Sequence, residues 1–169
     1  NSIAGVSLIR KLEGAEAHVF TVPLVINKAT GVKFGKSESG AVWLDERKTS
    51  VYAFYQFWLG VDDAGVIDYM KIYTLLSRDD IERLEKAVIE HPEHREAQKI
   101  LAFEVTKLVH GEEKARMAQN VTGVLFGDVP FAGLPADDID MLASEIPVSA
   151  PSTLVGVLVS SGVCASNGD

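Results

Sequence analysis

The chain has very little cysteine and no long apolar run. Cys164 is the only cysteine in 169 residues, so no intrachain disulfide can form, which fits a reducing compartment. No apolar run reaches the roughly 18 residues needed to cross a bilayer. The first residues soon reach Arg10 and Lys11 and lack a signal-peptide pattern. We therefore expect a cytoplasmic location. The first residue is Asn1 and not Met, so we expect a processed end or the edge of a fragment.

The chain also has no excess of positive charge. The chain has 16 basic and 24 acidic side chains and a net charge of −8, which argues against a wholly basic nucleic-acid coat. A local basic patch stays possible, because binding depends on the local field and not on the sum of charges. Internal repeats and low-complexity tracts are absent. The hydrophobic fraction of 47% is ordinary for a globular protein of one medium domain or two small ones.

The first part of the chain has the pattern of an α/β edge. Residues 2–13 place apolar side chains at three-residue steps, which predicts a short amphipathic helix ended by Gly14. Residues 19–26 are apolar and β-branched around Pro23, which predicts a strand at a sheet edge. A turn-like segment follows. A helix, a strand and a loop in this order suit the edge of a nucleotide-binding domain.

Helical patterns dominate after residue 48. Three predicted helices have candidate N-caps: Thr49 or Ser50 for the first, Asp62 or Asp63 for the second, and Ser77 for the third. Pro92 suits the first turn of a further helix that runs to His110. Five short helices with brief loops imply a helical bundle, and two short helices follow it after linkers. The predicted fold class is therefore mostly α.

The main candidate site is Lys-Phe-Gly-Lys-Ser at residues 33–37. Lys33 and Lys36 can hold two ammonium groups against a polyphosphate, and Ser37 adds a hydroxyl group. Gly35 allows the backbone to come close to an anion. On these five residues alone, a pair of solvated surface lysines is the more ordinary interpretation. The neighbouring segments decide between the two.

Other candidates have simpler structural explanations. The aromatic run from Tyr52 to Trp58 is more typical of a packed helix core than of a base-stacking platform. His91 and His94 have the spacing of metal ligands on a helix, but Pro92 interrupts the pattern and no third ligand is evident. We therefore expect no metal site.

Several segments together resemble one family. They are Thr-Val-Pro-Leu-Val at 21–25, Lys-Phe-Gly-Lys-Ser at 33–37, Ser-Gly-Ala-Val-Trp-Leu-Asp at 39–45, Lys-Thr-Ser at 48–50, Tyr-Gln-Phe-Trp at 55–58 and Val-Thr-Lys-Leu-Val-His-Gly-Glu at 105–112. In this order they resemble bacterial tyrosyl-tRNA synthetases, which typically spell the class I KMSKS loop as KFGKS or KFGKT. Two details depart from the family pattern. The connection from Val25 to Lys33 is one residue longer than expected, and Val51 stands where proline is common.

The resemblance implies a domain organisation. Residues 1–48 would be the end of a Rossmann-like α/β catalytic domain, and 49–130 an α-helical anticodon-binding domain. Residues 131–151 would be a linker with a short helix, and 152–169 the start of an S4-like RNA-binding domain. The HIGH-type ATP motif and the tyrosine pocket would lie upstream of Asn1. We therefore expect a middle piece of a longer enzyme, inactive alone, whose full-length form is a homodimer.

The resemblance also implies an activity. The whole enzyme would use ATP, with Mg²⁺ expected, to convert tyrosine to tyrosyl-adenylate, and would transfer the tyrosyl group to tRNA(Tyr) in translation. Lys33 and Lys36 would stabilise the leaving phosphates, and Ser37 would hydrogen-bond a phosphate oxygen. Leu24 and Val25 would offer backbone contacts to adenine. No residue is implied as a metal ligand.

The helical part would contact the anticodon stem through basic residues such as Arg95, Lys99 and Lys107. Two alternatives stay open. The first is a non-catalytic RNA-binding or interaction module, which would not require the lysine loop. The second is a tryptophanyl-tRNA synthetase, which is disfavoured by Phe34-Gly35 and by the Leu-Val-His-Gly run.

Overall fold

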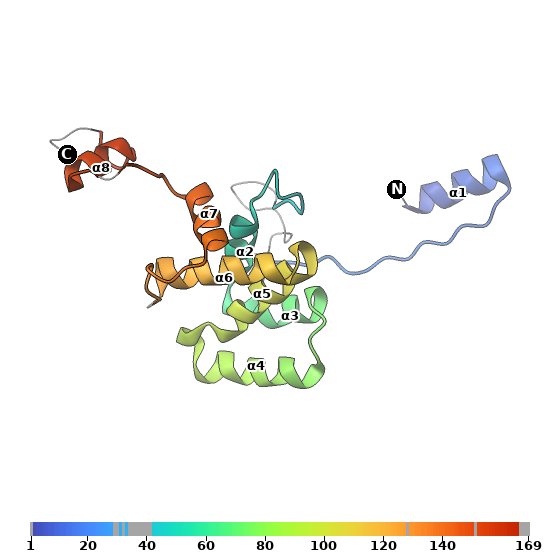
Figure 1. Cartoon of the computed structure of the whole chain (residues 1–169). Coiled ribbons are helices and arrows are strands. Elements are labelled where there is room, and N and C mark those ends of the chain that lie inside the picture. The colour runs from blue at the N-terminus through green and yellow to red at the C-terminus, as the bar shows by residue number, and fades with distance from the viewer. Residues whose placement is uncertain are drawn as a thin grey trace. The chain divides into compact units, whose positions relative to one another are not determined.

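The structure, a computed structural model, describes residues 2–28, 31, 33, 42–127, 129–150 and 152–165. It divides into two compact units, residues 1–34 and residues 35–169. Within the described ranges the regular elements are eight α-helices and one 3₁₀ turn, so the predicted mostly-α fold is confirmed. Figure 1 shows these elements in chain order.

The first unit begins with the predicted helix. Helix α1 spans Ser2–Glu13, and none of its residues is buried. Gly14 follows the helix with a positive φ of 64°. Its N–H donates to the carbonyl of Arg10 at 3.2 Å, which ends the helix as predicted.

The predicted strand over residues 19–26 is wrong. Among the residues that the structure describes, the only pairing of this segment is an isolated antiparallel bridge between Ile26 and Lys33. Phe20 is 91% exposed and Leu24 68% exposed, so no neighbouring layer covers this segment within its unit. A strand is stable only when its backbone groups pair with a neighbour and its apolar face is covered. Among the described residues of this unit, the expected sheet edge is reduced to the one bridge.

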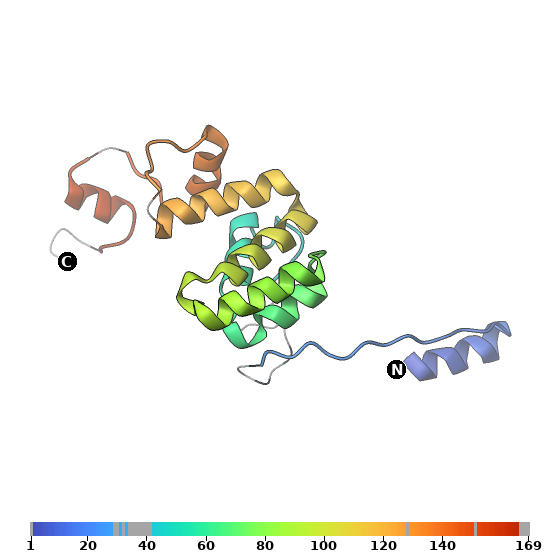
Figure 2. The ribbon, with the colours of Figure 1, turned by 90° about the horizontal axis from the view of Figure 1, so that it is seen from below.

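The second unit contains the predicted bundle of five helices. They are α2 (Val51–Leu59), α3 (Asp63–Tyr73), α4 (Arg78–Glu90), α5 (Glu96–His110) and α6 (Glu112–Phe126). Helix α5 is central, because it packs against α2, α3, α4 and α6. Figure 2 views the bundle from below, with α4 in front of the other helices.

Side-chain caps begin three of these helices. Ser50 and Asp62 are each one of the two candidates predicted at their helix, and Ser77 is the cap predicted for the third. The Ser50 hydroxyl accepts from the N–H of Ala53 at 3.1 Å. The Asp62 carboxylate accepts from the N–H of Gly65 at 2.8 Å. The Ser77 hydroxyl accepts from the N–H of Asp80 at 3.2 Å. Each cap satisfies a backbone donor that the helix itself leaves unpaired.

The aromatic run on α2 lies in the core of the bundle. Tyr55 is 1% exposed, Phe54 2% and Trp58 6%. Phe54 and Trp58 contact edge to face, with ring centres 6.3 Å apart. Leu101 on α5 is fully buried in the same core. The core interpretation of the aromatic run is therefore confirmed.

The chain between α4 and α5 departs from prediction. Pro92 begins a 3₁₀ turn, η1 (Pro92–His94), and not the long helix expected. Arg95 follows with a left-handed φ of 49°, and α5 starts directly after it. The Arg95 guanidinium donates to the carbonyls of Leu59 at 2.7 Å and Val61 at 3.2 Å. These tertiary hydrogen bonds offset the energetic cost of the left-handed backbone conformation at Arg95, which separates η1 from α5.

Two short helices follow the bundle. They are α7 (Ala136–Glu145) and α8 (Leu154–Ser160). Helix α7 packs against α6, where the Asn120 amide donates to the buried carboxylate of Asp138 at 2.8 Å. Helix α8 is capped by Thr153 and has no buried residue. Within the described ranges no helix has the length and apolar character to cross a membrane.

Candidate functional site

The lysine loop lies only partly within the described residues. Gly35, Lys36 and Ser37 fall in residues 34–41, outside the described ranges. Lys33 is exposed, and its backbone forms the bridge to Ile26. The segment just before Ile26 carries Leu24, which is 68% exposed, and the half-buried Val25. The bridge therefore brings Lys33 beside the segment predicted to contact adenine, and solvent reaches both.

A compact turn follows the lysine motif. The N–H of Trp43 donates to the Thr49 hydroxyl at 3.0 Å. The ammonium group of Lys48 lies 4.2 Å from the centre of the Trp43 ring, a cation–π contact. Asp45 and Arg47 form an ion pair at 2.8 Å, and the hydrogen bond from the Arg47 side chain lowers the pKa of Asp45. The segment that leads from the loop into α2 is thus held by its own side chains.

An ion pair joins this turn to the bundle. Glu46 accepts a hydrogen bond from Lys114 on α6, and this bond lowers the pKa of the Glu46 carboxyl. Both side chains are about half exposed, so the pair orients the turn more than it stabilises it. The two residues are 68 positions apart, and no spacing pattern predicts the contact.

His110 lies beside this ion pair and has a structural role. Its ring meets Phe54 edge to face, with ring centres 4.9 Å apart. Its Nε2 atom is buried and has no hydrogen-bond partner among the described residues. Burial lowers the pKa of His110, while the charge of Glu46 raises it and that of Lys114 lowers it. The pairing with Phe54 supports the interpretation of His110 as a packing residue.

The three basic residues predicted to contact RNA differ in their surroundings. Arg95 is held by the carbonyls of Leu59 and Val61, so its guanidinium is already engaged. Lys107 lies 3.9 Å from both Glu104 and Glu112.

Lys99 is exposed and forms no ion pair within the part of the chain that the structure describes. It is therefore the candidate most available to a phosphate. Together with Arg95, Lys99 lines a groove of about 560 Å³ between α2, α5 and α6.

The groove combines aromatic, amide and hydroxyl groups with this positive charge. Tyr55 and Gln56 line it from α2, and Gln119 and Thr122 line it from α6. The Gln56 amide donates to the Thr122 hydroxyl at 2.7 Å, which ties the two helices together. Amides, hydroxyls and a lysine are groups that commonly contact the phosphates and sugars of nucleic acids.

Positive charge is confined to one part of the chain. Every lysine and arginine lies at or before Arg116, so α7 and α8 carry none. Asp137, Asp140 and Glu145 add negative charge on α7. Any lysine or arginine contact to an RNA backbone would therefore come from residues up to Arg116, and α7 and α8 offer none.

A family model described as "tRNA synthetases class I (W and Y)" matches residues 1–127. This chain therefore belongs to the class I tRNA synthetases of the tryptophan and tyrosine group. The matched range contains the lysine motif, the turn after it and the whole helical bundle.

Within that group the relatives fall on the tyrosine side. The chain is 50% identical to the tyrosine–tRNA ligase of Geobacillus stearothermophilus over 172 residues, covering 98% of this chain and 40% of the relative. It is 44% identical to the ligase of Roseiflexus castenholzii, covering 100% of this chain and 42% of the relative. The resemblance to bacterial tyrosyl-tRNA synthetases is thereby confirmed. The chain spans about 40% of the length of such relatives.

A solved structure resembles part of the fold as well. A C-terminally truncated mitochondrial tyrosyl-tRNA synthetase from Coccidioides posadasii matches with a TM-score of 0.50 and 36% identity, over 59% of this chain and 25% of that chain. The domain boundaries and the roles of individual residues stay predictions.

Proposed function

We propose that this chain supplies the ATP-phosphate loop and the RNA-binding helical part of a tyrosine–tRNA ligase. The observation that carries the proposal is the Lys-Phe-Gly-Lys-Ser motif, within a chain that matches the class I family over residues 1–127 and whose relatives are tyrosine–tRNA ligases. The whole enzyme would make tyrosyl-adenylate from tyrosine and ATP, and would then pass the tyrosyl group to tRNA(Tyr).

The lysine loop acts on the first of these steps. A carboxylate oxygen of tyrosine attacks the α-phosphorus of ATP, and the bond to pyrophosphate breaks. Negative charge grows on the leaving phosphates, where the ammonium groups of Lys33 and Lys36 and the hydroxyl of Ser37 stabilise it. Contacts that strengthen only in the transition state raise the rate without tightening ATP binding. Mg²⁺ accompanies the ATP, and no residue of this chain is proposed as its ligand.

Adenine binding is proposed for the segment before the bridge. Exposed Leu24 and half-buried Val25 lie two residues and one residue before Ile26, which pairs with Lys33. Backbone N–H and C=O groups at this point are available to an adenine edge. A single short segment would thus face the base, while the lysine beside it faces the phosphates.

The experiment that tests the loop is Lys36→Ala in a full-length ligase carrying this chain. Tyrosine-dependent ATP–pyrophosphate exchange is expected to slow by about 10²- to 10³-fold, with ATP affinity nearly unchanged. Lys28→Ala is the matched control, because Lys28 precedes the motif and is expected to leave the rate unchanged. A Lys36→Ala enzyme with the normal rate would reject the proposed role.

RNA binding by the bundle is tested separately with Lys99→Glu. The expected result is a lower kcat/KM for tRNA(Tyr) in tyrosyl transfer and a weaker salt dependence of binding, with exchange unchanged. Lys86→Glu makes the same charge change on α4 outside the groove that Lys99 lines, and should alter neither property. Equal effects of the two substitutions would contradict a specific RNA contact at the groove.

A module that binds RNA without catalysis is the alternative. The 169-residue chain alone is expected to catalyse no exchange, because it spans only 40% of the length of the Geobacillus ligase. Exchange by the isolated chain would contradict this. Tryptophan in place of tyrosine should support no exchange by the full-length enzyme, which would separate the tyrosine from the tryptophan branch. The full-length enzyme is also proposed to be a homodimer, which analytical ultracentrifugation can test.

A further inference from the structure

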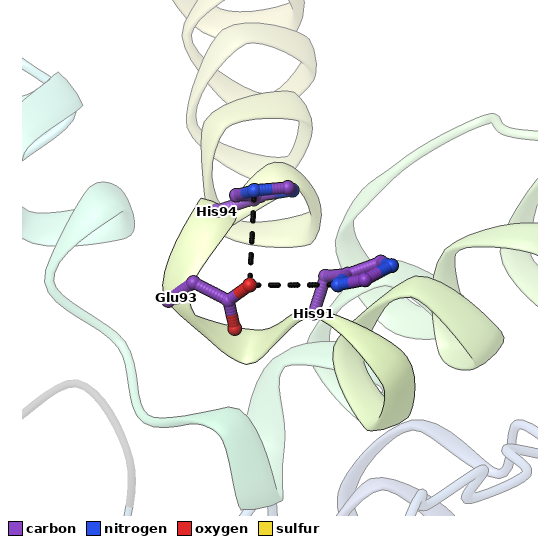
Figure 3. A group of neighbouring side chains, drawn as sticks. All are labelled: His91, Glu93 and His94. Atoms are coloured by element: carbon purple, nitrogen blue, oxygen red, sulfur yellow. Dashed lines mark ion pairs between the residues drawn. The ribbon is translucent and has the colours of Figure 1, made fainter.

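The corner between α4 and α5 gathers two histidines and a glutamate. The Nδ1 atom of His91 lies 3.4 Å from Oε1 of Glu93, and Nε2 of His94 lies 3.7 Å from the same oxygen. One ligand atom from each of the three side chains falls within 4.8 Å of the others. Figure 3 shows the glutamate oxygen facing both imidazoles. The sequence predicted no third ligand beside His91 and His94, whereas the 3₁₀ turn places Glu93 beside both.

These separations are close to those of a metal site. Zinc–nitrogen and zinc–oxygen bonds of about 2.0–2.2 Å at tetrahedral angles place two ligand atoms about 3.4 Å apart. The two imidazole rings lie 23° from parallel, with centres 5.2 Å apart. Since the His94 side chain is 67% exposed, its ring can turn to aim a nitrogen at the point that the other two ligands share.

The backbone of the corner is fixed before any ion binds. The N–H of His91 donates to Ala87 at 2.9 Å, and the N–H of His94 donates to His91 at 3.1 Å. Pro92 restricts the chain between them. The guanidinium of Arg95, held by two carbonyls of another segment, anchors the exit of the turn. A prearranged backbone reduces the entropy lost when three side chains are ordered on one ion.

Stability of the fold does not explain the cluster. The side chains of His91, Glu93 and His94 are 61%, 64% and 67% exposed, and exposed ion pairs contribute little. Two imidazoles and one carboxylate form a donor set that suits divalent transition ions such as Zn²⁺, Ni²⁺ and Cu²⁺. Mg²⁺ and Ca²⁺ prefer ligand sets made of oxygen alone.

We propose that His91, Glu93 and His94 bind one divalent transition-metal ion of the zinc type, with water in the remaining coordination positions. The ion ties His91, the C-cap of α4, to the end of the 3₁₀ turn η1. No catalytic step is assigned to it. The proposal does not depend on the ligase function, because it rests only on the three side chains and the turn that carries them.

The test is calorimetric titration of ZnCl₂ into the metal-free 169-residue chain. Cys164→Ser serves as the background, because a thiolate also binds zinc. One ion is expected per chain. Glu93→Gln and His94→Ala should each weaken zinc binding at least about tenfold. Loss of a residue that only hydrogen-bonds a metal ligand already costs about this much, so loss of a ligand should cost no less. His18→Ala is the matched control and should bind as the background does. MgCl₂ should give no saturable binding.

The outcomes separate the proposal from its competitors. NMR spectra with Zn²⁺ should shift the ring signals of His91 and His94 and leave those of His18 unchanged. The variants change exposed side chains, and circular dichroism should show intact helices. Absence of saturable zinc binding, or equal affinity in His94→Ala and the background, would overturn the site. One ion bound per two chains would also overturn it, since the ion would then bridge copies.

Discussion

The two units of this chain use apolar side chains in opposite ways. In the unit of residues 35–169, Val66, Met70 and Leu101 are fully buried in a core that α5 organises. In the unit of residues 1–34, none of the described residues is buried, and Phe20 is 91% exposed. Exposed apolar surface of this kind is usually covered by other protein. The bundle therefore has a core of its own, whereas the segment that leads to the lysine motif has none.

The same substitution in the two units gives the sharpest test of this difference. Leu101→Ala removes buried methyl groups from the centre of the bundle and should lower the free energy of unfolding by about 2–5 kcal/mol. Leu24→Ala changes an exposed side chain and should alter it by less than about 0.5 kcal/mol. Urea unfolding followed by circular dichroism measures both. Similar losses would mean that residues 1–34 belong to the same cooperative core.

A smaller effect is expected at the glycine between α5 and α6. Gly111 has φ 93° and ψ 159°, a region that side chains with a Cβ rarely adopt. Gly111→Ala should therefore destabilise the bundle by about 1–3 kcal/mol. Gly14 also has a positive φ, but it ends α1 in the other unit. Gly14→Ala should leave the bundle transition unchanged in thermal unfolding, and an equal decrease in melting temperature would contradict the separation of the units.

The smallest effect is a pH dependence from His110. Burial lowers its pKa, so the unfolded chain binds this proton more readily than the folded chain. Stability from this group is present above the ordinary histidine pKa of about 6.5 and is lost as pH falls below it. His110→Gln should flatten the change in urea midpoint between neutral and mildly acidic pH. His18→Gln in the other unit should not, and an unchanged slope in His110→Gln would reject this origin.

Much of the bundle was predictable because its signals are local. A capping side chain such as Ser50 or Asp62 acts on a backbone group within three residues. The aromatic residues of α2 lie on the buried face of a helix, which periodicity can identify. The strand expected over residues 19–26 failed for the opposite reason, since a strand depends on a neighbour that no local pattern supplies.

The candidate sites also differ in how far the sequence could predict them. The lysine motif is a contiguous stretch, so its residue types and order could be read directly, and the roles of Lys36 and Ser37 stay predictions. The contact between Glu46 and Lys114 joins positions 68 residues apart and could not be foreseen. The contribution of Glu93 was also missed, because the sequence predicted a long helix from Pro92 where the structure has the 3₁₀ turn that groups Glu93 with the two histidines.

The sequence by itself determined the family, most helices of the bundle and the residue order of the Lys-Phe-Gly-Lys-Ser motif, because each depends on residues close together in the chain. Tertiary structure alone decided that Arg95 ends the 3₁₀ turn, that Lys99 stays available while Arg95 is engaged, and that His91, Glu93 and His94 converge. The physical reason is the same in each case. The guanidinium of Arg95 donates to the carbonyls of Leu59 and Val61, about 35 residues earlier in the sequence, and so holds the backbone at Arg95. Local sequence preferences act over only a few residues and cannot predict such a contact.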